Sequence, residues 1–518
     1  MSKRCLTGAE ALVHAAANAG VRVCFANPGT TEMPLVAALD RVDGVRAVLG
    51  LHENVCTGAA DGYARIAGRA AMTLLHLGPG LANGLANLHN ARRANTPVLN
   101  VVGDHASWHL PYDTPLTSDI AALAATVGTV HTAGNALTIG QITRRAVEEA
   151  HRLRGVTTVI VPADHQQEPA ALPSRDRWRP AALLQVDSTR VEAAAARLRE
   201  AGPKGLLLLG GNTLTRPGQL AAVRIAAATG AELYAETFPA RSERGGGLPD
   251  IDRLPYFPEV ARALLADKDV VAVVGAEEPI AYFGYADVPS VLTRPGTLVQ
   301  LARPHEDAEA ALLELADLIG TKTASPNPPP VVSTPEHDQP LTGSTVGRVV
   351  ADGLPEGAIV SVEGGTSGYP FYSASAAAPA HTVLTNTGGA IGQGLPCALG
   401  AALAAPDRPV IALQSDGSGL YTLQALWTMS RERTNVTVLI AANHTYGVLR
   451  TELARHGNAE FGPQATALTS LADPRMDWVA LAHGFGVPAE RASTAGALRR
   501  TLADAATSDG PHLIEMAL

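Results

Sequence analysis

A carboxylate and an amide each follow an apolar run in the last third of the chain, and both side chains could bind a metal. Asp416 comes after the run VIAL (410–413), and Asn443 comes after VTVLI (436–440). A helix-length segment, 421–431, lies between them. This order predicts a βαβ unit, in which both turns lie at the carboxyl ends of parallel strands. We therefore expect Asp416 and Asn443 to lie close together.

The oxygens of Asp416 and Asn443 are hard ligands of the kind that Mg²⁺ binds. The backbone amides of Gly417 and Ser418 open the next helix, whose positive end would face a phosphate. The pattern predicts a Mg²⁺-bridged diphosphate site. Either turn taken alone is more often an ordinary strand-to-helix connection, with an Asp N-cap in one and an Asx-turn in the other.

Two side chains in the first third of the chain could carry protons. Glu53 begins a helix whose small residues predict tight packing, and partial desolvation there would raise its pKa toward the working pH. His76 ends an apolar strand, before Leu-Gly-Pro-Gly, which we interpret as a loop with free backbone donors. The ordinary alternatives are a solvated helix-start carboxylate and a structural histidine.

Two glycine-rich turns follow apolar runs in the third part of the chain. They are EGGTS (363–367) and TGGAIGQG (387–394). Either turn could let the backbone approach a cofactor closely, or could be a simple tight turn.

The elements that must position these residues alternate between short β patterns and Ala-rich helices. This alternation predicts an α/β fold of three doubly wound parallel-sheet domains. We expect a first domain over 1–168, a middle Rossmann-like domain over 186–320, a Pro-rich linker over 321–340 and a third domain over 341–518. The Gly210-Gly211-Asn212 turn of the middle domain lacks a GxGxxG continuation, so it predicts no dinucleotide.

Composition excludes several classes of function. The net charge of −9 and the lack of a long Lys/Arg block argue against nucleic acid and anionic membranes as partners. The four cysteines are widely spread, which favours core thiols in a reducing compartment over disulfides or a zinc site. No signal peptide or transmembrane run is apparent, so we expect a cytoplasmic protein.

Several phrases, in order along nearly the whole chain, resemble thiamine diphosphate (ThDP)-dependent 2-oxo-acid decarboxylases and carboligases. The phrases are ANPGTTEMP, HEN…GAADGYARIAG, LLHLGPG, GGAIGQGLPCALG, SDGS and NHTYGVLR. The family's metal signature is Gly-Asp-Gly followed at this spacing by Asn-Asn. Here Ser415 replaces the first Gly and Ala442 the first Asn, which leaves cofactor affinity open.

The resemblance implies a role for each matching residue. Glu53 would hydrogen-bond the aminopyrimidine of ThDP, Ile391 would hold the cofactor bent, and the Gly389 carbonyl would accept from its amino group. Asp416, Asn443 and the carbonyl of Thr445 would bind Mg²⁺. The remaining cofactor-binding residues predicted from the resemblance and the turns are Gly417, Ser418 and Thr366.

The implied chemistry is decarboxylation of a 2-oxo acid, followed by release of an aldehyde or its ligation to an aldehyde or a second 2-oxo acid. Family members form the site between two subunits, with the glutamate reaching across. A homodimer is therefore the minimum unit expected, and we expect a homotetramer.

Two branches of the family remain open. His76 and Thr30 match the positions of an active-site histidine and a substrate-binding serine in benzoylformate decarboxylase, whereas the second histidine of that enzyme falls near Phe283. The stretch HLGPGLANGLANLHNARRANTPVLNVVGDH resembles relatives of acetolactate synthase. We favour an acetolactate-synthase-like enzyme that requires no flavin, because FAD, although possible, has no signature in 186–320.

A third alternative is a chain of this fold without catalysis, which serves as a regulatory subunit. The departures at Ser415 and Ala442 would suit it. The presence of Glu53, Asp416 and Asn443 argues against it.

Overall fold

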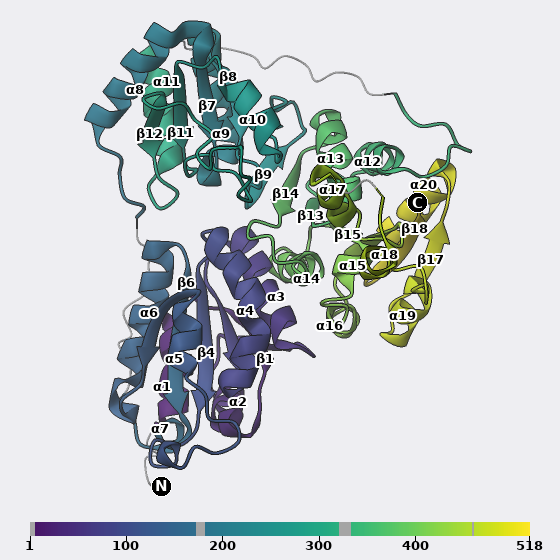
Figure 1. Cartoon of the computed structure of the whole chain (residues 1–518). Helices are drawn as coiled ribbons and strands as arrows, with labels where there is room; N and C mark the ends of the chain where they lie inside the picture. The colour runs from purple at the N-terminus through teal and green to yellow at the C-terminus, as the bar shows by residue number, and fades with distance from the viewer. Residues whose placement is uncertain (1–5, 172–181, 321–332, 458–459) are drawn as a thin grey trace.

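The computed structural model describes residues 6–171, 182–320, 333–457 and 460–518. Its strands form three sheets, each within an α/β domain, and Figure 1 shows the three domains grouped around the centre of the molecule. Most of the predicted linker, 321–332, lies outside the described residues, as does Cys5. No described helix combines the length and apolar character needed to cross a membrane.

The first sheet is parallel, with the strand order β2-β1-β3-β4-β6-β5. Its strands are β1 (Val23–Asn27), β2 (Arg46–Leu49), β3 (Ala71–Leu75), β4 (Val98–Asp104), β5 (Gly128–Thr132) and β6 (Val156–Pro162). Its helices are α1 (Gly8–Asn18), α2 (Met33–Arg41), α3 (Glu53–Ala67), α4 (Leu77–Arg93), α5 (Ile120–Ala125), α6 (Ile139–Leu153) and α7 (Ala163–Gln167), with 3₁₀ turns η1 (Thr30–Glu32), η2 (Leu110–Tyr112) and η3 (Ala136–Thr138).

Both faces of the first sheet are buried along its central strands β1, β3, β4 and β6, as their apolar residues require. Along β1, Cys24 and Ala26 belong to the core shared with α1, α2 and α6. The alternate residues Val23 and Phe25 belong to a core that includes α3 and α4. This period of two places helices on opposite faces of the sheet, as predicted for a doubly wound fold.

The middle sheet has the order β10-β8-β7-β11-β12. Its strands are β7 (Gly205–Leu209), β8 (Glu232–Ala235), β10 (Asp252–Arg253), β11 (Val270–Val274) and β12 (Leu298–Ala302). Its helices are α8 (Ser188–Ala201), α9 (Arg216–Thr229), α10 (Pro258–Leu265) and α11 (Ala308–Ile319), with 3₁₀ turns η4 (Gly202–Lys204) and η5 (Gly211–Leu214).

The third sheet has the order β17-β18-β16-β15-β13-β14-β9. Its strands are β9 (Arg241–Arg244), β13 (Ile359–Val362), β14 (His381–Thr385), β15 (Val410–Ser415), β16 (Val436–Ala442), β17 (Ala489–Ala492) and β18 (His512–Ala517). Its helices are α12 (Gly343–Asp352), α13 (Gly365–Ala374), α14 (Gly394–Ala404), α15 (Asp416–Gly419), α16 (Ala425–Glu432), α17 (Gly447–Arg455), α18 (Pro463–Thr469), α19 (Trp478–Gly484) and α20 (Ala495–Ala506), with a 3₁₀ turn η6 (Ser375–Ala377).

Strand β9 departs from the predicted separation of domains. It lies in the middle third of the sequence, yet it pairs antiparallel with β14, for example Arg244 with His381. The sequence RSER carries no apolar alternation, so no strand is predicted there.

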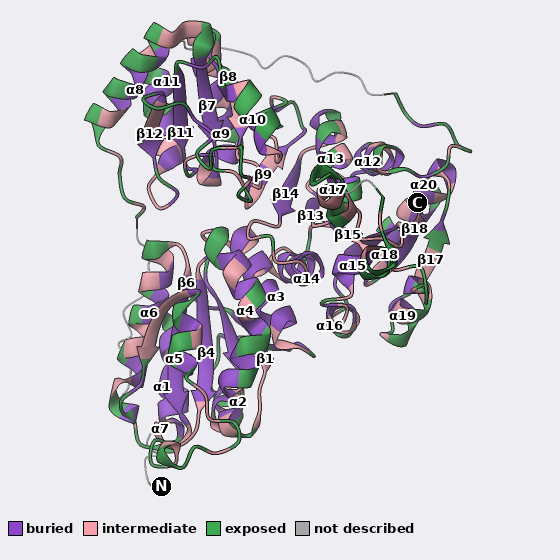
Figure 2. Cartoon of the chain, viewed as in Figure 1, coloured by how far each residue is buried: buried purple, intermediate pink, exposed green. Residues whose placement is uncertain are grey.

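Helices α3 and α14 join the first and third domains at very short range (Figure 1). A Cβ added to Gly62 would overlap the Cys397 carbonyl, and one added to Gly400 would overlap the Ala59 carbonyl. The core on this face continues from Phe25 of the first domain to Leu395 and Trp478 of the third. Figure 2 shows the buried sheets and the buried faces of these helices.

Candidate functional site

The predicted βαβ unit is confirmed, with β15 and β16 as adjacent parallel strands. Residues Ser415 and Ala441 pair at the ends of these strands, so Asp416 and Asn443 follow at the same sheet edge. The helix between them differs from the prediction over 421–431. It consists of α15, which begins at Asp416 itself, and α16, because the backbone turns between Gly419 and Ala425.

Three predicted residues from three strand ends come together at this edge. The Asp416 carboxylate accepts from the backbone N–H of His444 (2.7 Å) and of Gly417 (2.9 Å). The Asn443 amide nitrogen lies 3.4 Å from the hydroxyl of Thr366, which follows β13. The Asn443 side-chain oxygen accepts from the Thr445 N–H at 3.0 Å, and the Thr445 hydroxyl donates to the Thr469 carbonyl at 2.9 Å.

Buried charge at this edge favours a cation. The Asp416 side chain is only 2% exposed, and burial raises its pKa even though backbone N–H groups donate to it. The imidazole of His444 lies 3.8 Å away, and its two buried ring nitrogens have no hydrogen-bond partner among the described residues. A divalent cation beside Asp416 would compensate the buried carboxylate.

The backbone at two glycines of these turns lies very close to neighbouring groups. A Cβ at Gly417 would lie 2.6 Å from the Tyr446 ring, and one at Gly364 would lie 3.0 Å from the Ser415 hydroxyl. The Ser418 hydroxyl is already engaged, since it accepts from Gln414 at 2.5 Å and donates to the Ser415 carbonyl at 3.3 Å. By contrast, the buried Ser367 hydroxyl, next to Thr366, has no partner among the described residues, and the sequence analysis did not single it out.

The 386–394 turn, which contains Gly389 and Ile391, is held by hydrogen bonds from its own domain and from the first domain. Gly389 and Gly392 have φ values of +76° and +95°, in the left-handed region that favours glycine. The carboxylate of Glu363 accepts from the N–H groups of Gly392 (2.5 Å) and Gly394 (2.6 Å). Burial raises the pKa of Glu363, although these N–H groups oppose the effect.

Helix α4 of the first domain holds the other side of this turn through two fully buried asparagines. The Asn87 side chain donates to the Gly392 carbonyl (3.2 Å), and the Asn90 side chain donates to the Ala390 carbonyl (2.8 Å) and accepts from the Ala390 N–H (3.2 Å). Neither asparagine is among the residues predicted from the sequence. Their spacing on one face of an apolar helix is the signal that could have identified them.

A tyrosine from the middle domain also reaches this turn. A Cβ added to Gly389 would overlap the Tyr282 hydroxyl. The Tyr282 ring packs against Phe283, Tyr256 and Phe238, with centroid separations of 5.3, 5.4 and 5.6 Å. An aromatic cluster therefore adjoins the predicted cofactor turn.

Glu53 begins α3, as predicted, and its carboxylate accepts from the Asn83 side chain of α4 at 3.1 Å. No described hydrogen bond links Glu53 with Gly389, Asp416 or Asn443 of the same chain. A Cβ at Gly80 would lie 3.1 Å from the Glu53 carboxylate and 3.4 Å from the Cβ of His76, so these two side chains flank one glycine.

His76 directly follows β3, as predicted, but the segment after it is not the predicted loop. The Leu-Gly-Pro-Gly segment is the first turn of α4 and not a loop, since the helix begins at Leu77 and Pro79 is tolerated in a first turn. Leu77 is buried with φ +53°, an uncommon conformation for leucine. Thr30 is exposed, and it is Thr31 whose hydroxyl lies 3.2 Å from Nδ1 of His76.

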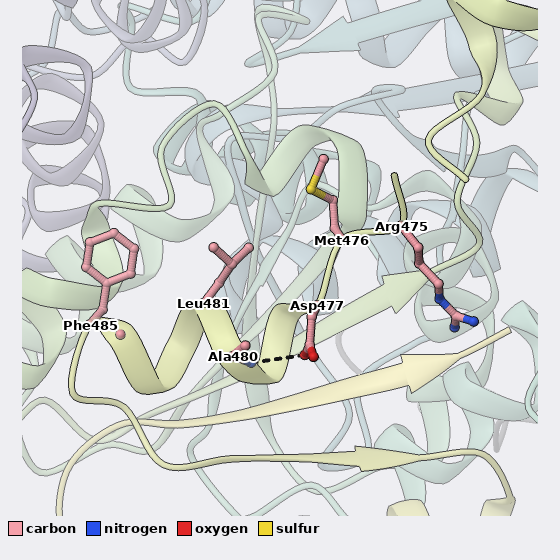
Figure 3. A pocket seen from close by; sticks show the side chains of 7 residues that line it. Arg475, Met476, Asp477, Ala480, Leu481 and Phe485 are labelled. Atoms are coloured by element: carbon pink, nitrogen blue, oxygen red, sulfur yellow. Dashed lines mark hydrogen bonds between the residues drawn. The ribbon is translucent and has the colours of Figure 1, made fainter. Parts of the chain in front are cut away.

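The chain also forms two hollows, one of which reaches the 386–394 turn at Thr387. One, of about 440 Å³, is formed on α19 and the segment before it, where Asp477 caps the helix by accepting from the Ala480 N–H (Figure 3). None of its lining residues is predicted to bind the cofactor. The other, of about 380 Å³, lies between the strand ends of the middle domain and the first domain, and it is lined by Glu236 and Arg154 among others.

The donor set fits a magnesium diphosphate. The carboxylate of Asp416 and the side-chain amide of Asn443 lie at one sheet edge, where the amide nitrogen of Asn443 reaches the Thr366 hydroxyl. Glycines in these turns leave room for a ligand, and buried polar atoms of Ser367 and His444 lack partners among the described residues. Asp416, Asn443 and the Thr445 carbonyl would hold the metal, and Gly417, Thr366 and Ser367 would face the phosphates.

Comparison with known proteins identifies ThDP-binding domains in the first and third parts of the chain, which contain these turns. Residues 6–124 match the N-terminal TPP binding domain of thiamine pyrophosphate enzymes, and residues 365–516 match the C-terminal TPP binding domain. IlvX of Mycobacterium tuberculosis, which carries the name of an acetolactate synthase large subunit, is 46% identical over 99% of both chains.

Two decarboxylases are also similar along the whole chain. Benzoylformate decarboxylase of Pseudomonas aeruginosa is 28% identical over 96% of both chains. The structure of the ThDP-dependent 4-hydroxybenzoylformate decarboxylase of Rhodococcus jostii RHA1 superposes with a TM-score of 0.84 at 25% identity, covering 98% of both chains.

Proposed function

Because the chain belongs to the family of thiamine-diphosphate-dependent enzymes, we propose that it decarboxylates a 2-oxo acid and transfers the remaining unit to a second carbonyl compound, as an acetolactate-synthase-like carboligase. The observation that carries this proposal is the convergence of Asp416, Asn443 and Thr366 at one sheet edge. The likeness to IlvX over the full length supports the carboligase branch.

ThDP, when bound, supplies an electron sink for the carbanion left as CO₂ departs. Asp416 and Asn443 would hold Mg²⁺ and through it the diphosphate. The fixed turn around Gly389 and Ile391 would orient the cofactor, and Glu53 would hold a proton at its aminopyrimidine ring. Placement and exclusion of water are the contributions of the protein.

The proposed working unit is a homodimer or a tetramer of two such dimers. This unit is inferred from the family resemblance, in which the glutamate at the position of Glu53 reaches across to the site of a second subunit. The buried free thiols Cys24, Cys56 and Cys397 support the cytoplasmic setting expected from the sequence.

A panel of 2-oxo acids, with and without aldehyde acceptors, tests the proposed reaction. We expect CO₂ release that requires both ThDP and Mg²⁺, with an acyloin as product when an aldehyde is the acceptor and a 2-hydroxy-3-oxo acid when a second 2-oxo acid is the acceptor. Tryptophan fluorescence should respond to ThDP with Mg²⁺ together and not to either alone. No response and no CO₂ with any 2-oxo acid would contradict the proposal.

A simple decarboxylase of aryl 2-oxo acids is the second candidate. The aromatic cluster of Tyr282, Phe283, Tyr256 and Phe238 beside Gly389 favours it, because aromatic walls suit an aryl substrate. Release of free aldehyde from aryl 2-oxo acids, without acyloin even in excess acceptor, would select this candidate.

A further inference from the structure

His76 forms a hydrogen-bonded group with two residues of the turn after β1. Its Nδ1 lies 2.7 Å from the carboxylate of Glu32, and the Thr31 hydroxyl donates to the same carboxylate at 2.6 Å. Glu32 is fully buried, whereas the His76 side chain is 23% exposed. The buried acid therefore lies behind the ring, and the other edge of the ring faces outward.

The surrounding backbone is adapted to this pair. A Cβ added to Gly29 would overlap the imidazole of His76, and one added to Gly103 would overlap the carboxylate of Glu32. The Gly29 N–H also donates to Glu32 at 2.8 Å. Two glycines on separate strand ends thus leave room for a buried carboxylate that contacts His76.

The direction of the hydrogen bond decides which ring nitrogen is available. The carboxylate that receives hydrogen bonds from Gly29 and Thr31 acts as an acceptor, so Nδ1 of His76 must donate to it. The lone pair of a neutral ring is then on Nε2. No described hydrogen bond involves Nε2, which leaves it free for a substrate.

We propose that Glu32 is a positioning residue that fixes His76 as the Nδ1–H tautomer, so that Nε2 accepts or returns a proton at the reacting carbonyl group. This inference deepens the proposed function and rests on it for the identity of the substrate. Thr31 completes the arrangement by fixing the carboxylate. The other acids that face this group are Glu53 of α3, which lies beside Gly80 as His76 does, and Asp104 of β4, which interacts electrostatically with Glu32.

Ring-nitrogen NMR of the full-length protein labelled with ¹⁵N-histidine tests the tautomer without any activity. The His76 signal is assigned by its loss in His76→Asn. We expect an Nδ1–H ring in the wild type and in Glu32→Gln, which retains an acceptor oxygen. Glu32→Ala should shift the ring toward the Nε2–H form that free imidazole prefers. A wild-type Nε2–H ring, or a ring unchanged in Glu32→Ala, would overturn the proposal.

A double-mutant cycle tests the consequence for turnover. Glu32→Ala should lower kcat roughly tenfold to a hundredfold with KM within about twofold. In a His76→Ala background the same change should lower kcat no further, because Glu32 acts through His76. Equal losses in both backgrounds would show a structural role only and would overturn the inference.

The matched control is Glu10, another buried carboxylate of the first domain, which accepts from the Thr7 N–H at 3.0 Å in the capping box of α1. Glu10→Ala should lower the Tm and leave both the His76 tautomer and kcat unchanged. If no 2-oxo acid is turned over, the proposed function fails, whereas the NMR result still decides the role of Glu32.

Discussion

The Asp416 carboxylate has a structural role in the observed fold, in addition to the metal-binding role proposed for it. Its carboxylate accepts from the N–H groups of His444 and Gly417, and so connects the ends of β15 and β16. The same group is buried with a raised pKa, which is unfavourable for an anion unless a cation binds. Binding of a cation beside Asp416 would therefore also stabilise the folded protein.

Replacing Asp416 by Asn tests this link. The amide retains the size of the side chain but removes the charge that would bind Mg²⁺, so we expect at least a tenfold weaker Mg²⁺-dependent binding of ThDP. Isothermal titration of ThDP at fixed Mg²⁺ measures it. Asp407→Asn, at an exposed position, is the control and should bind normally. Full ThDP affinity in the Asp416 variant would contradict the ligand assignment.

The raised pKa of Glu236 predicts how the stability of the folded protein depends on pH. Burial raises the pKa of this carboxyl from 4.5 to about 7, although the Gly211 N–H donates to it at 3.2 Å. Between about 4.5 and about 7 the folded state thus holds a proton that the unfolded chain has lost. Stability should therefore fall as pH rises through this range, because ionisation in the folded state is unfavourable.

Glu236→Gln mimics the protonated group and should remove this dependence. Its Tm should equal that of the wild type near pH 4.5 and exceed it increasingly up to pH 8. Thermal unfolding from pH 4.5 to 8 measures the difference. Glu314→Gln, at an exposed position of α11, is the control and should show no pH-dependent gain. A constant Tm difference at all pH values would rule out the raised pKa.

At the scale of elements, the turns with chemistry are positioned by close packing of helices on strands. Helix α14 begins where the fixed 386–394 turn ends, and its Gly400 contacts the backbone of α3. Any shift between α3 and α14 would therefore move Gly389 and Ile391 as well. The asparagines of α4 connect the same turn to the helix that follows His76.

Gly400→Ala should separate α14 from α3, because the added Cβ would overlap the Ala59 carbonyl. Overpacking of this kind typically costs about 1–3 kcal/mol. We expect a lower Tm and faster hydrogen exchange in 386–394, measured by differential scanning calorimetry and exchange mass spectrometry. Gly134→Ala is the control, since nothing lies within 4 Å of its added Cβ. Unchanged exchange in 386–394 would contradict the coupling.

Much of the element pattern could be predicted from the sequence. The apolar runs 410–413 and 436–440 begin at the first residues of β15 and β16, and each strand extends two residues beyond its run. The Leu-Gly-Pro-Gly turn was predicted wrongly as a loop, because Gly and Pro are usually helix breakers, whereas a first helical turn tolerates them. Strand β9 was missed because its charged residues have no apolar alternation.

The candidate site could be predicted only in part, because some of its contacts join residues that are distant in the sequence. The βαβ order identified Asp416 and Asn443, since adjacency of their turns follows from sequence order. Glu32, Asn87 and Asn90 were not identified, because their partners lie 44 to 305 positions away along the chain. A contact of that kind follows from tertiary packing and has no local signature.

At the scale of the whole molecule, the site is divided between the first and third domains, and the proposed dimer would bring Glu53 of one copy to the metal site of the other. A mixture of two inactive variants distinguishes this arrangement from a site within one chain. Coexpressed Glu53→Gln and Asp416→Asn chains would give hybrid dimers with one intact site.

Random pairing would make half of the dimers hybrids, so we expect about a quarter of wild-type activity from the coexpressed pair. Each variant expressed alone is the control and should remain inactive. Activity of the separately tagged and copurified hybrid, measured as CO₂ release, gives the result directly. An inactive hybrid would place both residues of each site in the same chain.

Strand β9 has a consequence for the synthesis of this protein. The ribosome produces β9 well before β14, since Arg244 pairs with His381, and the edge groups of β9 have no partner until β14 has emerged. Such long-range pairing slows folding and leaves an unpaired, aggregation-prone strand edge on the nascent chain. A fragment that begins at residue 341 lacks β9, so β14 would be left as an unpaired edge strand. A fragment that is to contain the complete third sheet must therefore begin before Arg241.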